Sequence, residues 1–338
     1  MIDLSSPRVS VVMPVFNAAS TLPTAIESVL AQSLRAFELL VIDDGSSDQS
    51  PDIAERFAAS DHRIRVVRLQ HVGLVGALNR GCREARSQYV ARMDADDLMH
   101  PKRLGHQWDA MQADPSLAVL ACQVEVFSEG LLSEGLARYF AWQNSCVSAQ
   151  QVAANIYREA PFAHPSVMLR RDVLTAIGMY RDGDFPEDYE LWLRLHAAGY
   201  KMEKLPKVLM KLREHARRAT HNDARYSDQA FSKIRARYLA DDSRMKQPYV
   251  VWGAGRRTRQ RLGLLLDLVG CPVAWVDIDR RKIGQSIQGS PVVSPDWLLA
   301  NRQAMILAAV RNHGAMEQIS SWLEQNQFQI ATHWLPVG

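Results

Sequence analysis

The stretch Tyr89-Val-Ala-Arg-Met93-Asp94-Ala95-Asp96-Asp97 carries a short apolar run into three carboxylates within four residues. The run is typical of a β-strand, and strands of open α/β sheets present functional groups at their carboxyl ends. Three crowded carboxylates repel one another unless a cation neutralises them, and a set of oxygen ligands alone suits Mg²⁺ or Mn²⁺. The alternative is a solvated acidic turn before the helix that Pro101 opens, because Asp is also an ordinary turn and cap residue.

Similar apolar runs precede this stretch and alternate with amphipathic helices. We expect parallel strands at Val9–Val15, Phe37–Ile42 and Ile64–Leu69, with Tyr89–Met93 as the fourth. Strands and helices joined by short turns form βαβ units, which predict a mostly parallel sheet flanked by helices on both faces. The second strand also ends in carboxylates, in Asp43-Asp44-Gly45-Ser46. Both acidic ends should therefore face the same crevice.

The alternation becomes less regular after the helix that ends near Ala113. The pattern predicts two strands and then two helices, in that order, over Leu117–Val126, His164–Met168, Tyr189–Ala198 and residues 223–240. Strand and helix signals restart beyond the polar stretch 241–247. We therefore expect two α/β domains, at residues 1–245 and 246–338, the first ending in a helical extension.

Composition limits the classes of partner and the location. The chain has 338 residues, 47% of them hydrophobic, and a formal charge of +3, which is too small to predict nucleic acid as the main partner. No apolar segment approaches the roughly 20 residues that span a bilayer. Four cysteines are scattered without metal-ligand spacing, which favours reduced thiols. These features predict a cytoplasmic protein, and peripheral attachment to the inner face of the membrane stays open.

Four motifs together resemble the family 2 glycosyltransferases of GT-A fold. They are Val11–Asn17, Val41–Ser46, Asp94–Asp97 and Glu187-Asp188 with Trp192, and the resemblance covers roughly residues 8–220. It implies an inverting enzyme that uses a nucleotide-diphosphate sugar and Mn²⁺ or Mg²⁺. Carboxylates that hold a metal fit this chemistry, because a departing diphosphate needs charge stabilisation.

The resemblance also implies roles for single residues. Asp96 would be the chief metal ligand, and Asp94 would bind the donor's ribose or the water shell of the metal. Asp43 or Asp44 would accept a hydrogen bond from the base, which favours uridine, although Asp before Gly is also a common turn. His215, in the basic segment Arg213–His221, would ligate the metal or cover the diphosphate; a solvated basic loop is the alternative. The donor-binding residues implied are Pro14, Phe16, Asn17, Asp43, Asp44, Arg80, Asp94 and Arg213.

Inversion needs a general base to take the proton of the acceptor hydroxyl as it attacks. The resemblance implies that Asp188 is this base, with Glu187 beside it. The alternative is that Asp188 caps the helix that follows, where a carboxylate meets free N–H groups and the positive end of the helix dipole. Both roles can hold at once.

The smaller domain partly matches a dinucleotide-binding fingerprint. Gly253-Ala-Gly255 follows a strand at Tyr249–Trp252, and Asp277 follows the next strand, but the third glycine is replaced by Thr258. The length suggests three or four strands. A structural or homo-oligomerising role is favoured and nucleotide binding comes second. The apolar face of an expected helix over 259–269 provides candidate packing surface, formed by Leu262, Leu265, Leu266 and Val269.

The combined interpretation is a metal-dependent transferase. It would move a sugar, most simply from a UDP-sugar, to a saccharide or lipid-linked saccharide acceptor in surface polysaccharide synthesis. One alternative is a catalytically silent nucleotide-sugar-binding protein. A nucleotidyltransferase would need a phosphate loop rich in Gly and Lys or Arg near the N-terminus, and Pro14–Ser20 does not provide one.

Overall fold

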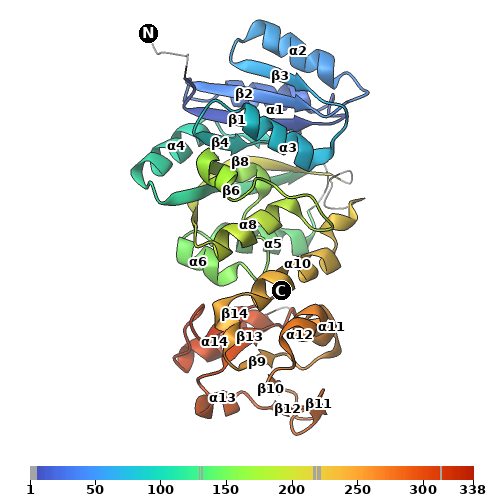
Figure 1. Cartoon of the computed structure of the whole chain (residues 1–338), viewed down its shortest axis with the longest axis vertical. Helices are drawn as coiled ribbons and strands as arrows, with labels where there is room; N and C mark the ends of the chain where they lie inside the picture. Colours follow the sequence, from blue (N-terminus) through green and yellow to red (C-terminus); the bar gives the residue numbers. More distant parts are fainter. Residues whose placement is uncertain (1–5, 129, 131, 216–217, 219–221, 313) are drawn as a thin grey trace. The chain divides into compact units, whose positions relative to one another are not determined.

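The computed structural model describes residues 6–128, 130, 132–215, 218, 222–312 and 314–338 (Figure 1). The chain forms two compact units. The first unit contains residues up to Ala149 together with Pro161–Gly183 and Ala198–Asn222. The second unit contains Gln150–Ala160, Asp184–Ala197 and Asp223–Gly338. Each unit has its own sheet and its own apolar core.

The sheet of the first unit has eight strands in the order β3-β2-β1-β4-β7-β6-β8-β5. Its first four members are parallel: β1 (Val9–Val15), β2 (Phe37–Asp43), β3 (Ile64–Arg68) and β4 (Tyr89–Arg92). The others are β5 (Leu98–Met99), β6 (Leu117–Ser128), β7 (Met168–Arg170) and β8 (Lys201–Glu214). Strand β7 runs antiparallel to both β4 and β6, whereas β6 and β8 are parallel. The mostly parallel sheet expected from the sequence is confirmed.

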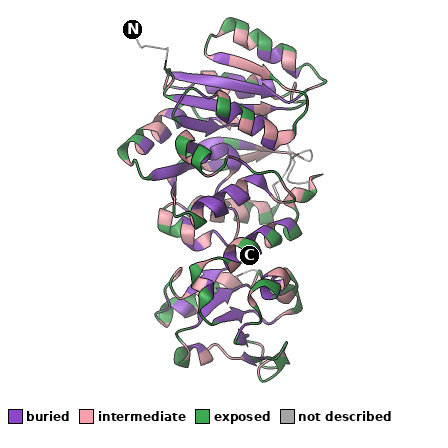
Figure 2. Ribbon diagram, in the orientation of Figure 1, coloured by how far each residue is buried: buried purple, intermediate pink, exposed green. Residues whose placement is uncertain are grey.

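The central parallel strands are continuous apolar runs because both of their faces are buried. All seven residues of β2 are buried, and so are six of the seven in β1 (Figure 2). Helices cover both faces of such a sheet, so its strands need apolar side chains on both sides. The helices of this unit are α1 (Leu22–Leu30), α2 (Ser50–Ser60), α3 (Gly73–Glu84), α4 (Arg103–Ala113), α5 (Glu134–Ser145) and α7 (Arg171–Ala176).

The segment His164–Met168 differs from the expected strand. Residues His164–Ser166 form a 3-10 helix, and strand β7 begins only at Met168. Pro165 explains the difference, because its ring fixes φ and it has no N–H to donate to a neighbouring strand. The strand is therefore displaced toward the C-terminus of this segment.

The sheet of the second unit has six strands in the order β11-β12-β10-β9-β13-β14, more than the three or four expected. They are β9 (Tyr249–Trp252), β10 (Ala274–Val276), β11 (Ser286–Ile287), β12 (Ser290–Val293), β13 (Met305–Ala308) and β14 (Trp334–Pro336). All pair in parallel except β11, which is antiparallel to β12. Each strand has at most four residues, too few for a reliable apolar pattern.

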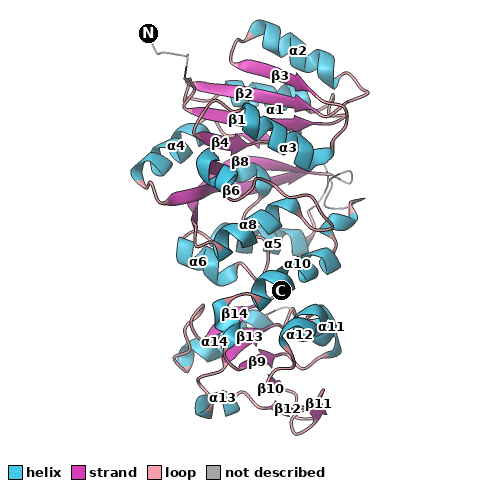
Figure 3. Cartoon of the chain, viewed as in Figure 1, coloured by secondary structure: helices cyan, strands magenta, loops and turns pink. Residues whose placement is uncertain are grey.

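The helices of the second unit come from all three of its chain segments (Figure 3). They are α6 (Ala149–Asn155), α8 (Glu187–Ala197), α10 (Asp228–Ala240), α11 (Arg256–Arg261), α12 (Gly263–Val269), α13 (Trp297–Ala300) and α14 (Ala315–Gln325). The single helix expected over 259–269 is thus two short helices that meet at Leu262.

The apolar residues expected to mediate self-association are mostly used within the second unit. Leu262, Leu265 and Leu266 are buried, and helix α12 packs against α10. Association between copies of the chain through this unit would therefore need other residues. Among the described residues, no helix combines the length and the apolar character that crossing a bilayer requires.

Candidate functional site

The three carboxylates of Asp94, Asp96 and Asp97 lie together just after β4. One oxygen from each can be chosen so that all three lie within 4.8 Å of one another. Asp97 is buried, whereas the side chains of Asp94 and Asp96 are about a quarter exposed, at 25% and 27%. Because β4 pairs with β1 inside the parallel part of the sheet, the cluster stands at the carboxyl ends of these strands.

Asp97 has one buried carboxylate oxygen that the described residues leave unsatisfied. Its Oδ1 accepts a hydrogen bond from the main-chain N–H of Arg213 at 2.8 Å, but its Oδ2 is buried and has no hydrogen-bond partner among the described residues. Burial and the nearby charges of Asp94 and Asp96 raise the pKa of Asp97 well above its usual range. A divalent cation would supply the missing partner and offset the repulsion, so this set of oxygen donors fits Mg²⁺ or Mn²⁺.

Asp94 differs from Asp97 because it has a cationic partner. The buried guanidinium of Arg92 forms an ion pair with its Oδ1. Burial alone would raise the pKa of Asp94, but the charge of Arg92 outweighs this effect and the pKa is lowered. Asp94 is therefore held in place and ionised, whereas the raised pKa of Asp97 favours its protonated form.

The end of strand β8 brings two predicted residues to the cluster. The Nε of Arg213 donates to the main-chain oxygen of Asp96 at 3.0 Å, and its guanidinium lies 4.7 Å from the centre of the Phe127 ring. The Nε2 of His215 lies 2.8 Å from Oδ2 of Asp96. His215 can thus act with the carboxylates as a ligand. The later residues of this basic segment, Ala216, Arg217 and His221, lie outside the described residues.

The carboxylates after β2 are held by main-chain N–H groups. Asp44 accepts from Val72 at 2.6 Å and from Gly73 at 2.9 Å, where helix α3 begins. Asp43 accepts from Ser46 at 3.3 Å. Both side chains are buried, so the turn-forming role is present in the geometry. A carboxylate oxygen has two lone pairs, which leaves acceptor capacity for a bound base.

Hydrogen bonds join the loop after β1 to the loop after β2. Oδ1 of Asn17 accepts from the N–H of Ser47 at 2.8 Å, and the N–H of Ala18 donates to Oγ of Ser50 at 2.9 Å. Asn17 has a φ of 51°, a left-handed conformation that Asn tolerates better than most residues. Pro14 lies within β1 and is half-buried. These contacts hold two of the predicted donor-binding motifs together.

An exposed aromatic pair stands beside Asp44. The Phe16 ring, 50% exposed, stacks on His71 with centroids 4.4 Å apart and an interplanar angle of 28°. Nδ1 of His71 lies 3.1 Å from Oδ2 of Asp44. Sequence reasoning did not select His71. Its only signal was its place in the loop that follows the third strand, the same position that Asp43 and Asp44 hold after the second.

Two other residues have partners elsewhere. Arg80 lies on α3, where its guanidinium pairs with Glu84 at 3.0 Å, and no contact among the described residues links it to the acidic cluster. His164 is buried, and its Nε2 lies 3.0 Å from the hydroxyl of Tyr180. That position is consistent with a structural histidine.

Glu187 and Asp188 open helix α8, which belongs to the second unit. Oδ1 of Asp188 accepts from the N–H of Tyr189 at 2.6 Å, as a residue near a helix N-terminus does. Glu187 is 2% exposed, and its Oε2 accepts from the hydroxyl of Tyr226 at 2.7 Å. Asp188 is only half-buried and is thus the more accessible of the two carboxylates.

Comparison with known proteins gives consistent findings. The description "Glycosyl transferase family 2" matches residues 10–178. The chain is 31% identical over 216 residues to EpsE of Bacillus subtilis (strain 168), covering 62% of this chain and 74% of EpsE. It is 32% identical over 207 residues to the amylovoran biosynthesis glycosyltransferase AmsE of Erwinia amylovora, covering 60% and 75%.

Two solved structures share the fold at low sequence identity. TarS 1-349 of S. aureus in complex with UDP-GlcNAc superposes with a TM-score of 0.56 at 16% identity, covering 78% of this chain and 71% of TarS 1-349. The mannosyltransferase PcManGT of Pyrobaculum calidifontis, in complex with GDP-Man and Mn²⁺, gives 0.50 at 21%, covering 70% and 62%. The expected fold class, a GT-A-like sheet with a second α/β domain, is confirmed.

Proposed function

Because this chain belongs to glycosyltransferase family 2, we propose that it is a metal-dependent, inverting enzyme of polysaccharide synthesis. It moves a sugar from a nucleoside-diphosphate sugar to a saccharide or lipid-linked saccharide acceptor. The observation that carries the metal dependence is the buried Oδ2 of Asp97, which has no partner among the described residues and lies within a cluster of three carboxylates. A lipid-linked acceptor would require the enzyme to work at a membrane surface, and we propose the cytoplasmic, inner face.

The acidic cluster would hold the cation. Asp94, Asp96 and Asp97 would supply oxygens, and His215 would add a nitrogen from the end of β8. A divalent cation held there would supply positive charge to offset the charge that develops on the departing diphosphate. Arg92 keeps Asp94 ionised and in place, so the cluster is oriented before the donor arrives. Arg213 fixes the strand β8 to the cluster through Asp96 and Asp97.

The base of the donor binds at the carboxyl ends of β1, β2 and β3. Phe16 and His71 offer an exposed aromatic surface on which a base can stack, and Asp43 and Asp44 offer acceptors beside it. An acceptor pairs with the N3–H of uracil, which supports a UDP-sugar donor. TarS has been crystallised with UDP and with UDP-GlcNAc, whereas PcManGT has been crystallised with GDP-Man.

In the proposed reaction, Asp188 is the general base. It takes the proton of the acceptor hydroxyl while that oxygen bonds to the anomeric carbon and the bond to the diphosphate breaks on the opposite face. Its carboxylate is half-buried, whereas Glu187 is buried and bonded to Tyr226, so Asp188 is the more accessible of the two. Glu187 then acts as a positioning residue for the start of α8.

A paired comparison of aspartates tests the metal dependence. Asp96→Asn removes one carboxylate of the cluster, and Asp109→Asn, on the exposed face of α4, is the matched control. Release of UDP from a panel of UDP-sugars should require Mn²⁺ or Mg²⁺, stop in EDTA and fall at least about 100-fold in Asp96→Asn. UDP titration with Mn²⁺ present should also show weaker metal-dependent binding in that variant. Wild-type turnover in EDTA, or in Asp96→Asn, would refute the proposal.

A further inference from the structure

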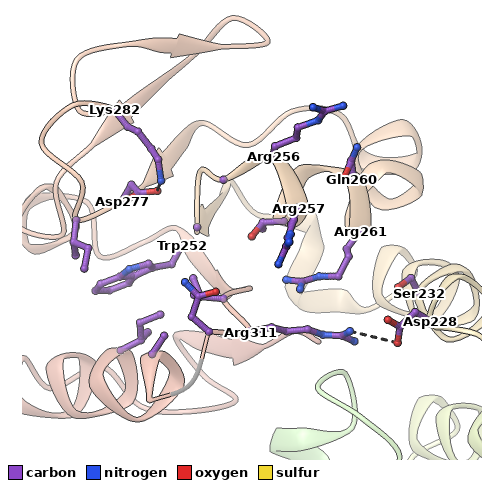
Figure 4. Close-up of a pocket in the computed structure, with 18 of the residues that line it drawn as sticks. Asp228, Ser232, Trp252, Arg256, Arg257, Gln260, Arg261, Asp277, Lys282 and Arg311 are labelled. Atoms are coloured by element: carbon purple, nitrogen blue, oxygen red, sulfur yellow. Dashed lines mark hydrogen bonds and ion pairs between the residues drawn. The ribbon is translucent and has the colours of Figure 1, made fainter.

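The second unit contains a large cavity that the proposed function does not use. Its volume is about 1190 Å³, somewhat above the range of about 300–1,000 Å³ typical of small-molecule sites (Figure 4). Residues line it from the turn after β9, the ends of β10 and β13, and helices α10 and α14. In the sheet, β10 pairs on one side of β9 and β13 on the other. The cavity thus lies where the strand order reverses, the usual place for a ligand in an open α/β sheet.

Positive charge is in excess around this cavity. Its described lining includes three carboxylates, Asp228, Asp267 and Asp277, and six cationic side chains, Lys233, Arg256, Arg257, Arg261, Lys282 and Arg311. Lys282 pairs with Asp277 at 2.8 Å, and Arg311 pairs with Asp228 at 3.5 Å. Within the described chain, no carboxylate lies within 4.0 Å of the guanidinium groups of Arg256, Arg257 or Arg261. The lining therefore carries cations without protein counterions, which favours an anionic ligand.

The guanidinium of Arg261 is only partly satisfied by hydrogen bonds in this cavity. Its Nη2 donates to the main-chain oxygen of Ala309 at 2.6 Å, whereas its Nε is buried and has no partner among the described residues. Burial and the neighbouring charges of Arg311 and Arg235 lower the pKa of Arg261 to about 10. In Figure 4 the side chains of Arg257 and Arg261 extend toward the same point. A bound anion at that point would relieve the repulsion.

The other end of the cavity is apolar and aromatic. Trp252 and Trp322 line it with an edge-to-face contact, their ring centroids 5.3 Å apart, and Ile278, another apolar lining residue, is 71% exposed. One end therefore suits a flat apolar ring and the other suits phosphate groups. A nucleoside phosphate combines both parts.

The residues of the incomplete dinucleotide fingerprint serve the fold instead of a ribose. Oδ2 of Asp277 accepts from the N–H of Ala254 at 3.1 Å as well as from Lys282, so it fastens the glycine turn. Thr258, which replaces the third glycine, donates its hydroxyl hydrogen to Ala309 at 3.1 Å. A Cβ on Gly253 would come within 2.9 Å of Val310, so this turn tolerates only glycine. Asp277 and Thr258 therefore hold the turn itself, and the turn does not reproduce the dinucleotide fingerprint.

We propose that this cavity is a second nucleotide site, which binds a nucleoside diphosphate without a metal. The phosphates lie against Arg257 and Arg261, and the base lies at the end formed by Trp252, Trp322 and Ile278. The protein's own cations neutralise the diphosphate here, whereas the acidic cluster of the first unit needs a divalent ion to do so. The ligand is either the free nucleotide or the diphosphate portion of a nucleotide sugar.

Titration calorimetry on the full chain in EDTA separates this site from the metal-dependent one. The probes are UDP, ADP, UDP-GlcNAc and inorganic pyrophosphate. Wild type and Asp96→Asn should bind one equivalent of UDP or ADP equally, and pyrophosphate should bind more weakly because it lacks a base. Tighter binding of UDP-GlcNAc than of UDP would identify the sugar nucleotide as the ligand, and the reverse order would identify the free nucleotide.

Two arginine variants locate the site. Arg257→Gln, at an exposed position, and Arg261→Gln should each weaken binding about 10-fold or more, the scale of a lost hydrogen bond to a charged group. Arg237→Gln, at an exposed position of α10 outside the cavity, should bind as wild type does. The proposal is overturned by any one of three results. They are no binding of any probe at millimolar concentration in EDTA, equal binding in Arg257→Gln and Arg237→Gln, and loss of binding in Asp96→Asn.

Discussion

Replacing Lys204 by Met should remove a pH dependence of stability that this buried lysine creates. Lys204 lies on β8 with only 3% of its surface exposed. Its ammonium group donates to the main-chain oxygens of Gln143 and Pro161, the latter at 2.9 Å, and lies 5.7 Å from the centre of the Phe162 ring. Burial lowers the pKa of Lys204 from 10.5 to about 8.

The sign and the size of the effect follow from this pKa. The pKa in the folded state is below that of the unfolded state, so between about pH 8 and 10.5 the folded protein binds fewer protons. The free energy of unfolding should therefore rise with pH across this window, and below the window Lys204 should add no pH dependence. The two values lie about 2.5 pH units apart, which corresponds to roughly 3 kcal/mol at 1.36 kcal/mol per unit.

Urea unfolding of both proteins from pH 7 to 10.5 measures this contribution. At neutral pH, Lys204→Met relieves the burial of a charge but leaves two carbonyl groups without a donor, and these effects oppose each other. The informative quantity is therefore the difference between the two proteins as a function of pH, in which all other titrating groups cancel. Lys211→Met is the control, because Lys211 is on the same strand and its side chain is 56% exposed. A difference that stays constant from pH 7 to 10.5 would refute the reasoning.

Three further substitutions have defined outcomes. Asp188→Asn should lower kcat by on the order of 10² to 10⁴-fold in a UDP-release assay, yet leave the melting temperature nearly unchanged, because Asn can also cap a helix. Gly81→Ala should lower the free energy of unfolding by about 1–3 kcal/mol, because the new Cβ would overlap the Val12 side chain. Gly105→Ala on α4 should not destabilise, because its Cβ would meet only Oγ of Ser33, at an ordinary contact distance of 3.8 Å. Phe16→Ala should weaken UDP binding about 5-fold or more in a calorimetric titration with Mn²⁺ present, and should do so without changing stability, because the ring is exposed.

The parallel half of the first sheet was predictable because its strands are long and apolar throughout. Strand β1 has the expected bounds, and β2 and β3 each differ by one residue at the end. The short strands of the second unit were partly missed, since two to four residues carry little periodicity. Helix α5 lies in the stretch after β6 where the sequence pattern was irregular. Its main signal is Ser133, whose hydroxyl accepts from the N–H of Leu136 at 3.2 Å.

The candidate site was predictable where its residues are neighbours in the chain. Asp94, Asp96 and Asp97 are visible as one motif, and their clustering follows from spacing alone. The stack of Phe16 on His71 was not visible, because it joins two loops that are distant in sequence. Nor does the sequence indicate that Asp97 is the buried carboxylate. Its burial depends on how β8 returns to the sheet beside the cluster, which is a long-range property of the fold.

The discontinuous second unit has a consequence for biosynthesis. Its three segments are tied together: the hydroxyl of Tyr189 donates to the main-chain oxygen of Ile156 at 2.7 Å, and that of Tyr238 donates to Glu190 at 2.7 Å. A ribosome makes Ile156 first and strand β14 last, an interval on the order of ten to forty seconds at about 5–20 residues per second. Helix α8 carries Trp192, which is fully buried in the finished protein, and α8 is made before α10, the helix it packs against. We expect a chaperone that covers α8 during translation to increase the yield of active enzyme while leaving its melting temperature unchanged.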